Sequence, residues 1–156
     1  MRALLSEFAG GPAALVLREL PDPMVGPGQV RIAVRCCGVN FPDALLIEDK
    51  YQMRPPRPFA PGLETSGVID LVGADVTSLK IGDRVIAHVE YGGFAEKLVV
   101  AGRLDRLPTA AAIYLLIVAG KFSLEYLTTC IEASVVERII VRFRTMMRST
   151  TDASMQ

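Results

Sequence analysis

The stretch RPFAPGLETSGVIDLVGADVTSLKIGDRV, residues 57–85, carries the pattern that decides the fold. Two β-rich runs begin in it, SGVIDLVG at 66–73 and DRVIAHV at 83–89. Glycine, aspartate and proline bound both runs, and these residues favour turns. Short apolar runs between turn residues are typical of strands. The stretch therefore predicts two successive strands of a sheet.

Further strand-like runs lie on both sides of this stretch. They are ALVLREL at 14–20, QVRIAVRCC at 29–37 and FAEKLVV at 94–100. In the run at 29–37, apolar residues recur at every second position, which predicts one buried face formed by Val30, Ile32, Val34 and Cys36. Many short strands at this spacing predict a mainly β fold, a closed or partly open antiparallel barrel.

One short helix interrupts the strands. Pro42 suits the first helical turn, where its missing N–H costs nothing, and Asp43 suits the positive end of the helix dipole. The run DALLIEDKY continues the helix to Tyr51, and the proline-rich 53–62 stops it. Glycines at 62, 67, 92 and 93 are interpreted as turn and packing residues.

After Pro108 the composition changes, and we predict a domain at 1–108 followed by a helical or mixed tail at 109–156. The apolar run 109–120 reads as a buried helix, and apolar residues from Ser123 onward recur at helical spacing. The piece RIIVRF at 138–143 is β-branched enough to be a strand instead, and periodicity leaves both readings open.

Charge and cysteine content exclude several classes of protein. Seventeen basic and seventeen acidic residues cancel, which argues against a general surface for nucleic acid or anionic membranes. Cys36, Cys37 and Cys130 are an odd number without C-x-x-C spacing, which predicts reduced thiols in a cytoplasmic protein. The longest apolar run, 110–119, is about half a membrane span, so no spanning segment is expected.

Three segments carry a specific family resemblance: CCGVNFPDALLIEDKYQ at 36–52, the stretch at 57–85, and GGFAEKLVV at 92–100. Together they resemble the amino-terminal GroES-like catalytic domain of medium-chain dehydrogenases/reductases. They are most similar to the zinc-independent quinone oxidoreductases, the zeta-crystallin-like group. The resemblance covers about 1–108. It implies a GroES-like, partly open barrel and NADPH-dependent hydride transfer to a quinone or enone.

The same resemblance bears on zinc. In the zinc-dependent alcohol dehydrogenases of this superfamily, the ligating Cys of G-V-C-H-T-D falls on Asn40, and the ligating His of P-G-H-E falls on Leu63. Catalytic zinc needs three protein ligands with nitrogen, sulfur or carboxylate donors. Leu63 has no donor atom, and a neutral Asn amide is a poor zinc ligand. We therefore expect no metal site.

The resemblance implies two catalytic candidates. Asn40 would face the nicotinamide and the substrate, where an amide can donate and accept hydrogen bonds. It could equally cap the helix that starts at Pro42, and the two roles are compatible. Tyr51 would line the substrate pocket, where its hydroxyl could hydrogen-bond a quinone oxygen. A packing tyrosine at a helix end is the alternative.

The resemblance also places Asp43, Leu63 and Glu64 at the substrate pocket. Without a metal to neutralise, Glu64 is interpreted mainly as a structural hydrogen-bond partner, and Asp43 mainly as a first-turn helix charge. His88 is the only histidine of the chain and has no second His or Cys beside it in the sequence. It is interpreted as a structural strand residue.

No segment of the sequence reads A-x-x-G-x-x-G, the phosphate-binding turn of a Rossmann cofactor domain in this group. The single G-x-G, at 26–28, contains a proline and leads into a strand. Two hypotheses follow. The chain is an oxidoreductase catalytic domain, inactive alone because it lacks a cofactor domain; or it is a non-catalytic barrel used for binding, with self-association or a partner contact through 109–156.

Overall fold

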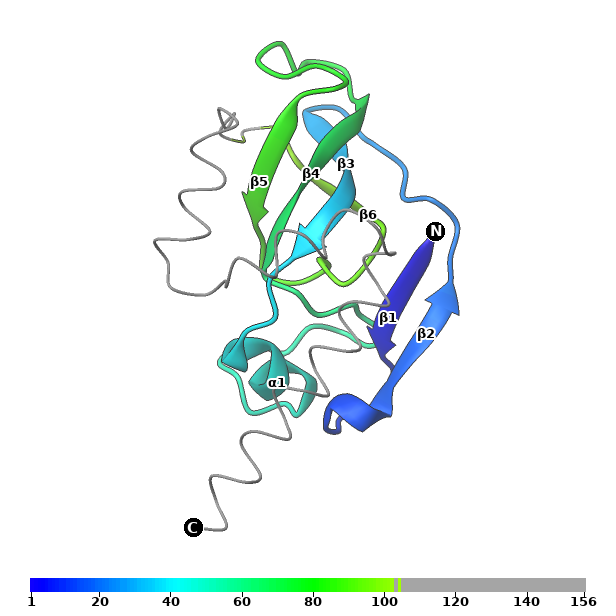
Figure 1. Ribbon diagram of the computed structural model, residues 1–156, viewed down its shortest axis with the longest axis vertical. Helices are drawn as coiled ribbons and strands as arrows, with labels where there is room; N and C mark the ends of the chain where they lie inside the picture. Colours follow the sequence, from blue (N-terminus) through cyan, green and yellow to red (C-terminus); the bar gives the residue numbers. More distant parts are fainter. Residues whose placement is uncertain (103, 105–156) are drawn as a thin grey trace.

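The computed structural model describes residues 1–102 and 104, which form a mainly β fold with one α-helix (Figure 1). The elements in chain order are β1 (Arg2–Ser6), the 3₁₀ turn η1 (Pro12–Ala14), β2 (Leu15–Glu19), β3 (Gln29–Cys37), α1 (Phe41–Ile47), β4 (Glu64–Val72), β5 (Arg84–His88) and β6 (Lys97–Ala101). The four later strands form one antiparallel sheet in the order β5-β4-β3-β6, and β1 pairs with β2.

Strand β3 lies inside the larger sheet and has the predicted bounds, 29–37. Val30, Ile32 and Val34 are buried, as the alternation predicts. The prediction fails at the end of the strand, where Cys37 is buried and Cys36 is only half-buried. The register between β3 and β4 shifts between Val34 and Cys36. Such a bulge exchanges the two faces of the strand, which explains the failure.

Strand β1 joins the two sheets and was not predicted from the sequence. Its backbone bonds the segment before β6, with Leu4 N donating to Phe94 O at 2.8 Å and Glu96 N donating to Arg2 O at 3.0 Å. An isolated bridge between Ser6 and Phe59 extends the pairing. The strands thus curl into the open, GroES-like barrel that the sequence predicts, with a core that includes Ile32, Leu46, Ile69 and Phe94.

Helix α1 packs below the sheet (Figure 1) and ends at Ile47, four residues before the predicted end at Tyr51. Asp49 adopts a left-handed backbone with φ 58°, and the N–H groups of residues 49 and 50 bond the carbonyls of residues 46 and 45. This is a Schellman cap, normally built on glycine. Arg57 supports it, because its guanidinium donates to Ile47 O at 2.9 Å and to Asp49 Oδ1 at 2.8 Å.

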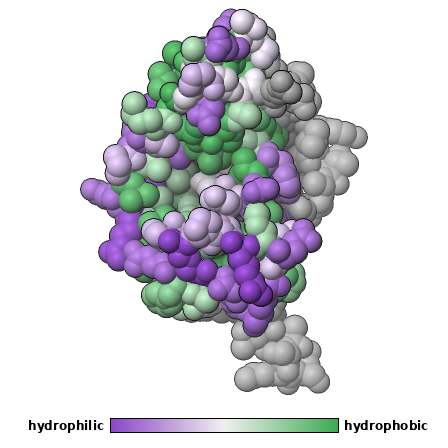
Figure 2. Space-filling model, turned by 180° about the vertical axis from the view of Figure 1, so that it is seen from behind, coloured by the Kyte–Doolittle hydropathy of each residue, from purple (hydrophilic) through white to green (hydrophobic). Residues whose placement is uncertain are grey.

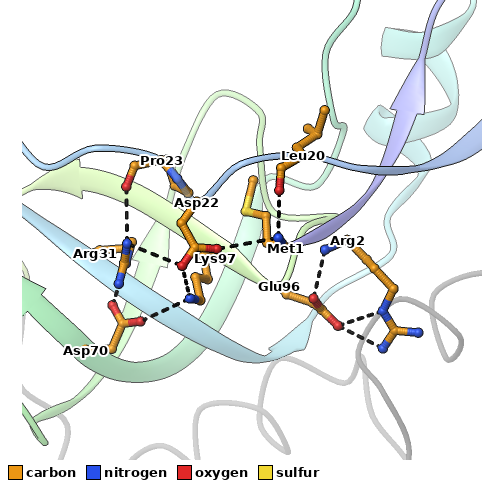
Figure 3. A network of polar contacts seen from close by, with 9 residues as sticks. All are labelled: Met1, Arg2, Leu20, Asp22, Pro23, Arg31, Asp70, Glu96 and Lys97. Atoms are coloured by element: carbon orange, nitrogen blue, oxygen red, sulfur yellow. Dashed lines mark hydrogen bonds and ion pairs between the residues drawn. The ribbon is translucent and has the colours of Figure 1, made fainter.

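A network of charged groups ties the strands together on one side of the barrel (Figure 3). Asp22 contacts the N-terminal ammonium at 3.5 Å, the Lys97 ammonium, and the Arg31 guanidinium at 3.7 Å. Arg31 also bonds Asp70 at 2.8 Å. The network therefore joins the β2–β3 linker to β3, β4 and β6. None of these charged side chains lines the hollow described below, so we assign the network a structural role.

The remaining predicted strands are confirmed with small shifts of their bounds. The run 94–100 divides, because residues 94–96 bond β1 before β6 begins at Lys97. Predictions about the tail at 109–156, and about self-association through it, concern residues outside those described. In the part of the chain that the structure describes, no helix is long and apolar enough to cross a membrane.

Candidate functional site

A large hollow opens between the end of β5 and strand β6. It has a volume of about 1100 Å³ and is lined by residues 51–53, Leu63, 88–92, 98–101 and Leu104. Four separate parts of the chain therefore meet at it: the segment after α1, Leu63 just before β4, the β5 end with its following loop, and β6 with Leu104. Figure 2 shows one face of the molecule, on which hydrophobic side chains gather in the upper part and hydrophilic ones form a band below.

Two of the predicted site residues, Tyr51 and Leu63, line this hollow. Tyr51 is half-buried and packs against the core. Leu63 is 9% exposed, and its carbonyl accepts the Val89 N–H at 2.7 Å, which fixes the start of β4 against the end of β5. A tyrosine and an apolar residue thus border one space, an arrangement suited to a flat, mostly apolar ligand.

The other three candidates, Asn40, Asp43 and Glu64, are not among the residues lining the hollow. They form a polar cluster at the start of α1. Asn40 occupies the N-cap position, and its side-chain Nδ2 donates to Glu64 Oε2 at 3.2 Å. Glu64 follows Leu63 directly in the chain. The cluster therefore lies beside the wall of the hollow rather than in it.

Asp43 is fully buried, and its carboxylate bonds two segments of the backbone. Oδ2 accepts the N–H of Asn40 at 2.8 Å, and Oδ1 accepts the N–H of Gly62 at 3.0 Å. Burial, aided by the nearby Glu64 charge, raises the pKa of Asp43 to about 6, although the backbone hydrogen bonds from Asn40 and Gly62 oppose this rise. Asp43 thus links the start of α1 to the residue before Leu63.

Cys36 and Cys37 form no disulfide with each other, and Cys130 lies outside the described residues. Burial, together with the charges of Asp43 and Glu64, raises the pKa of the Cys37 thiol well above its usual value. Its sulfur lies close to Gly62 and Gly93. This buried, protonated thiol is a packing group of the barrel.

His88 and Tyr91 are site residues that the sequence reasoning did not select. Both are exposed and both line the hollow. His88 pairs in register with Glu64 across β5 and β4. A strand pattern alone gives no signal for this, because the position of β5 at the edge of the sheet decides what its exposed residues border. Tyr91 could have been noted for the turn before Gly92 and Gly93, where an aromatic residue is accessible.

The described residues fit the groups that the family resemblance implies only in part. Among residues 1–102 and 104, no cluster of three or more His, Cys, Asp or Glu side chains is arranged to hold a metal ion. For a dinucleotide, the hollow suits an aromatic ring, but a diphosphate needs free N–H groups at a helix start. At the start of α1 the Asp43 carboxylate already accepts the Asn40 N–H, and its charge would repel a phosphate.

Comparison with known proteins gives a consistent picture. The family model for the alcohol dehydrogenase GroES-like domain matches residues 26–109, just over half of the chain. A curated relative from Rattus norvegicus, quinone oxidoreductase-like protein 2, is 44% identical over 95 residues, covering 60% of this chain and 27% of its own length. The chain therefore spans about a quarter of the length of this curated relative.

Solved structures of related proteins also resemble this chain. Human synaptic vesicle membrane protein VAT-1 homolog-like protein superposes with a TM-score of 0.67 at 33% identity, covering 70% of this chain and 36% of that one. The quinone oxidoreductase from Thermus thermophilus, whose structures include a complex with NADPH, gives a TM-score of 0.58 at 36% identity, covering 70% of this chain and 33% of that one.

Proposed function

Because the chain belongs to the alcohol dehydrogenase GroES-like domain family, in the medium-chain dehydrogenase/reductase superfamily, we propose that its hollow binds a quinone or enone for reduction with NADPH. The observation that carries this proposal is that Tyr51 and the apolar Leu63 line the same hollow. In this proposal, residues 1–104 supply the substrate side of the active site.

The chemistry assigns a clear task to Tyr51. When bound, NADPH would supply a hydride, and the quinone would take that hydride and one proton to become a hydroquinone, leaving NADP⁺. Negative charge develops on the quinone oxygen during the transfer, and a hydroxyl donor aimed at that oxygen stabilises it. Leu63 and the other apolar residues exclude water, which strengthens that hydrogen bond.

Asn40 has a second proposed role on the nicotinamide side. Its amide is oriented by the bond to Glu64 Oε2, and the resemblance implies that it faces the nicotinamide and the substrate. Asp43 and Glu64 act through it, Asp43 by holding the Asn40 backbone and Glu64 by holding its side chain. We assign them positioning roles, and no direct contact with the reacting atoms.

We further propose that the reaction needs no zinc and takes place in the cytoplasm. Asn40 and Leu63 stand where zinc-dependent relatives of the superfamily have ligands, and Leu63 has no donor atom. The grip on the diphosphate has to come from residues other than 1–102, since the start of α1 does not provide it. Because the sequence contains no A-x-x-G-x-x-G turn, we expect the 156-residue chain to bind the quinone without turning it over.

The test is a titration of the ¹⁵N-labelled 156-residue chain with tetramethyl-1,4-benzoquinone, followed by NMR. This quinone has no free ring carbon at which a thiol such as Cys36 could add. We expect saturable shifts confined to the residues that line the hollow. Tyr51→Phe removes the hydroxyl and should weaken binding about fivefold, the effect of one hydrogen bond of about 1 kcal/mol.

Tyr91→Phe is the matched control. Tyr91 also lines the hollow, but the proposal gives its hydroxyl no role. Its affinity for the quinone should equal that of the unaltered chain. Shifts scattered over the barrel, or equal losses from both substitutions, would contradict the role of Tyr51. Absence of saturable binding would overturn the proposed function itself.

A further inference from the structure

The two sides of the hollow differ in chemistry. All its polar and aromatic side chains come from the segment after α1 and from the end of β5 with its loop: Tyr51, Gln52, His88, Glu90 and Tyr91. The opposite side consists of residues 98–101 of β6 and Leu104, which are all aliphatic. The side chains of one side can therefore hydrogen-bond a ligand, and the side chains of the other can make only apolar contact.

The aliphatic side is the edge of a sheet. Strand β6 is the last strand of the order β5-β4-β3-β6, and four consecutive residues of it line the hollow. Side chains alternate between the faces of a strand, so four consecutive lining residues mean that the strand presents its edge. Leu98, Val99 and Val100 are half-buried and Ala101 is exposed. They form an apolar track about 10 Å long, at roughly 3.3 Å per residue.

The size of the hollow also exceeds what a single ring needs. Its volume of about 1100 Å³ lies above the roughly 300–1,000 Å³ typical of pockets for drug-sized ligands. A one-ring quinone placed at Tyr51 would not use the aliphatic side chains along β6. A ligand with an apolar extension would contact them, and burying apolar surface against apolar surface is favourable.

From this asymmetry we infer the substrate class: a quinone that carries an aliphatic side chain, with its ring among the polar residues near Tyr51 and its chain along Leu98, Val100 and Leu104. This inference rests on the proposed function and adds to it the part of the substrate that gives specificity. The residues that determine this specificity are those of β6, which the family resemblance does not assign to the substrate pocket.

The experiment compares two quinones by isothermal titration calorimetry on the full 156-residue chain. Both are trimethyl-1,4-benzoquinones; the fourth substituent is methyl in one and butyl in the other. Each fully buried methylene is worth about fourfold in affinity. With three added methylenes on a half-open track, we expect the butyl compound to bind about tenfold more tightly.

Val100→Thr tests the track itself. The substitution keeps the shape and the β-branching of the side chain and replaces one methyl with a hydroxyl. It should reduce the tenfold advantage of the butyl compound over the methyl compound to about threefold or less. Val16→Thr makes the same change on β2, half-buried and outside the hollow, and should change neither affinity.

The outcomes separate the two proposals. If both quinones bind with equal affinity, the inferred substrate class is wrong and the proposed function stands. If neither binds, the proposed function fails first. Light scattering on the unaltered chain and on Val100→Thr adds a third outcome: if the chain self-associates and this substitution abolishes the association, β6 is a protein contact, and the inference is overturned.

Discussion

Asp43 is the residue at which stability and site geometry meet. Its buried carboxylate holds Asn40 and Gly62 in place, yet burial raises its pKa from 3.8 to about 6. A carboxyl group whose pKa is higher in the folded than in the unfolded state binds more protons when folded. Its contribution to stability is therefore full below about pH 4 and is lost as the pH rises through 6.

Asp43→Asn should remove this dependence on pH. The free energy of unfolding of the unaltered chain, minus that of the variant, should increase by up to about 3 kcal/mol between pH 7.5 and pH 4, at about 1.4 kcal/mol per pKa unit. Urea unfolding at a series of pH values measures it. Taking the difference cancels the carboxyl groups whose pKa is lowered by ion pairs, such as Glu7 and Glu96. Parallel pH profiles for the two proteins would contradict the assignment.

Gly62 is tightly packed between Phe94 and Cys37. Its φ is +98°, and a Cβ there would lie 2.8 Å from the backbone N of Phe94 and 2.9 Å from the sulfur of Cys37. Gly62→Ala should therefore cost at least about 3 kcal/mol, from backbone strain and overpacking together.

Gly82→Ala is the matched control for this substitution. Gly82 has φ +93° with no atom within 4 Å of the added Cβ, so it isolates the backbone strain, about 1 kcal/mol. Urea unfolding of both variants gives the comparison. Equal losses of stability would show that the close contacts of Gly62 with Phe94 and Cys37 do not matter.

At the scale of elements, Arg57 fixes where α1 ends. Its guanidinium bonds both Ile47 O and Asp49 Oδ1, and it lies 5.3 Å from the centre of the Phe59 ring. One guanidinium makes both bonds at once, and a lysine ammonium cannot reproduce that fork. Arg57→Lys should lower the free energy of unfolding by about 1–2 kcal/mol.

Arg18→Lys provides the comparison, because Arg18 also makes a two-bond contact, with Glu7, but on the surface. Exposed pairs of this kind contribute little, so the loss should stay within about 0.5 kcal/mol. Thermal or urea unfolding of the two variants decides the matter. A larger loss at Arg18 than at Arg57 would contradict the view that Arg57 caps the helix.

The elements also show what a sequence can and cannot predict here. Alternation at Val30, Ile32 and Val34 predicts the core face of β3, but the bulge that exchanges Cys36 and Cys37 depends on pairing with β4. The helix end was misplaced because an aspartate, Asp49, takes the left-handed position where glycine is expected. Strand β1 was missed because its pairing partners lie far along the chain, beside Phe94 and Phe59.

The candidate site also contains residues that the sequence predicts and residues that it does not. The family resemblance brought out Tyr51 and Leu63, which meet at the hollow, and Asn40, Asp43 and Glu64, which meet beside it. The sequence does not single out His88 and β6, because these residues border the hollow through the edge positions of β5 and β6 in the sheet. Edge positions follow from the whole arrangement of strands, which local patterns do not encode.

At the scale of the whole molecule, the proposed function makes residues 1–102 and 104 one wall of an oxidoreductase site. The charged network around Asp22 and Arg31 fixes the strands to one another (Figure 3), and the hollow lies between the end of β5 and β6. A stable barrel with one open apolar hollow is a suitable frame for binding a substrate. It also leaves the diphosphate of a dinucleotide without a helix start to bind.

The most direct test of this account is a crystal structure of the 156-residue chain grown with both NADPH and tetramethyl-1,4-benzoquinone. We expect the quinone in the hollow, with one oxygen within hydrogen-bonding distance of the Tyr51 hydroxyl, and no diphosphate held by residues 1–102. A quinone bound elsewhere, or a dinucleotide gripped by the start of α1, would contradict it.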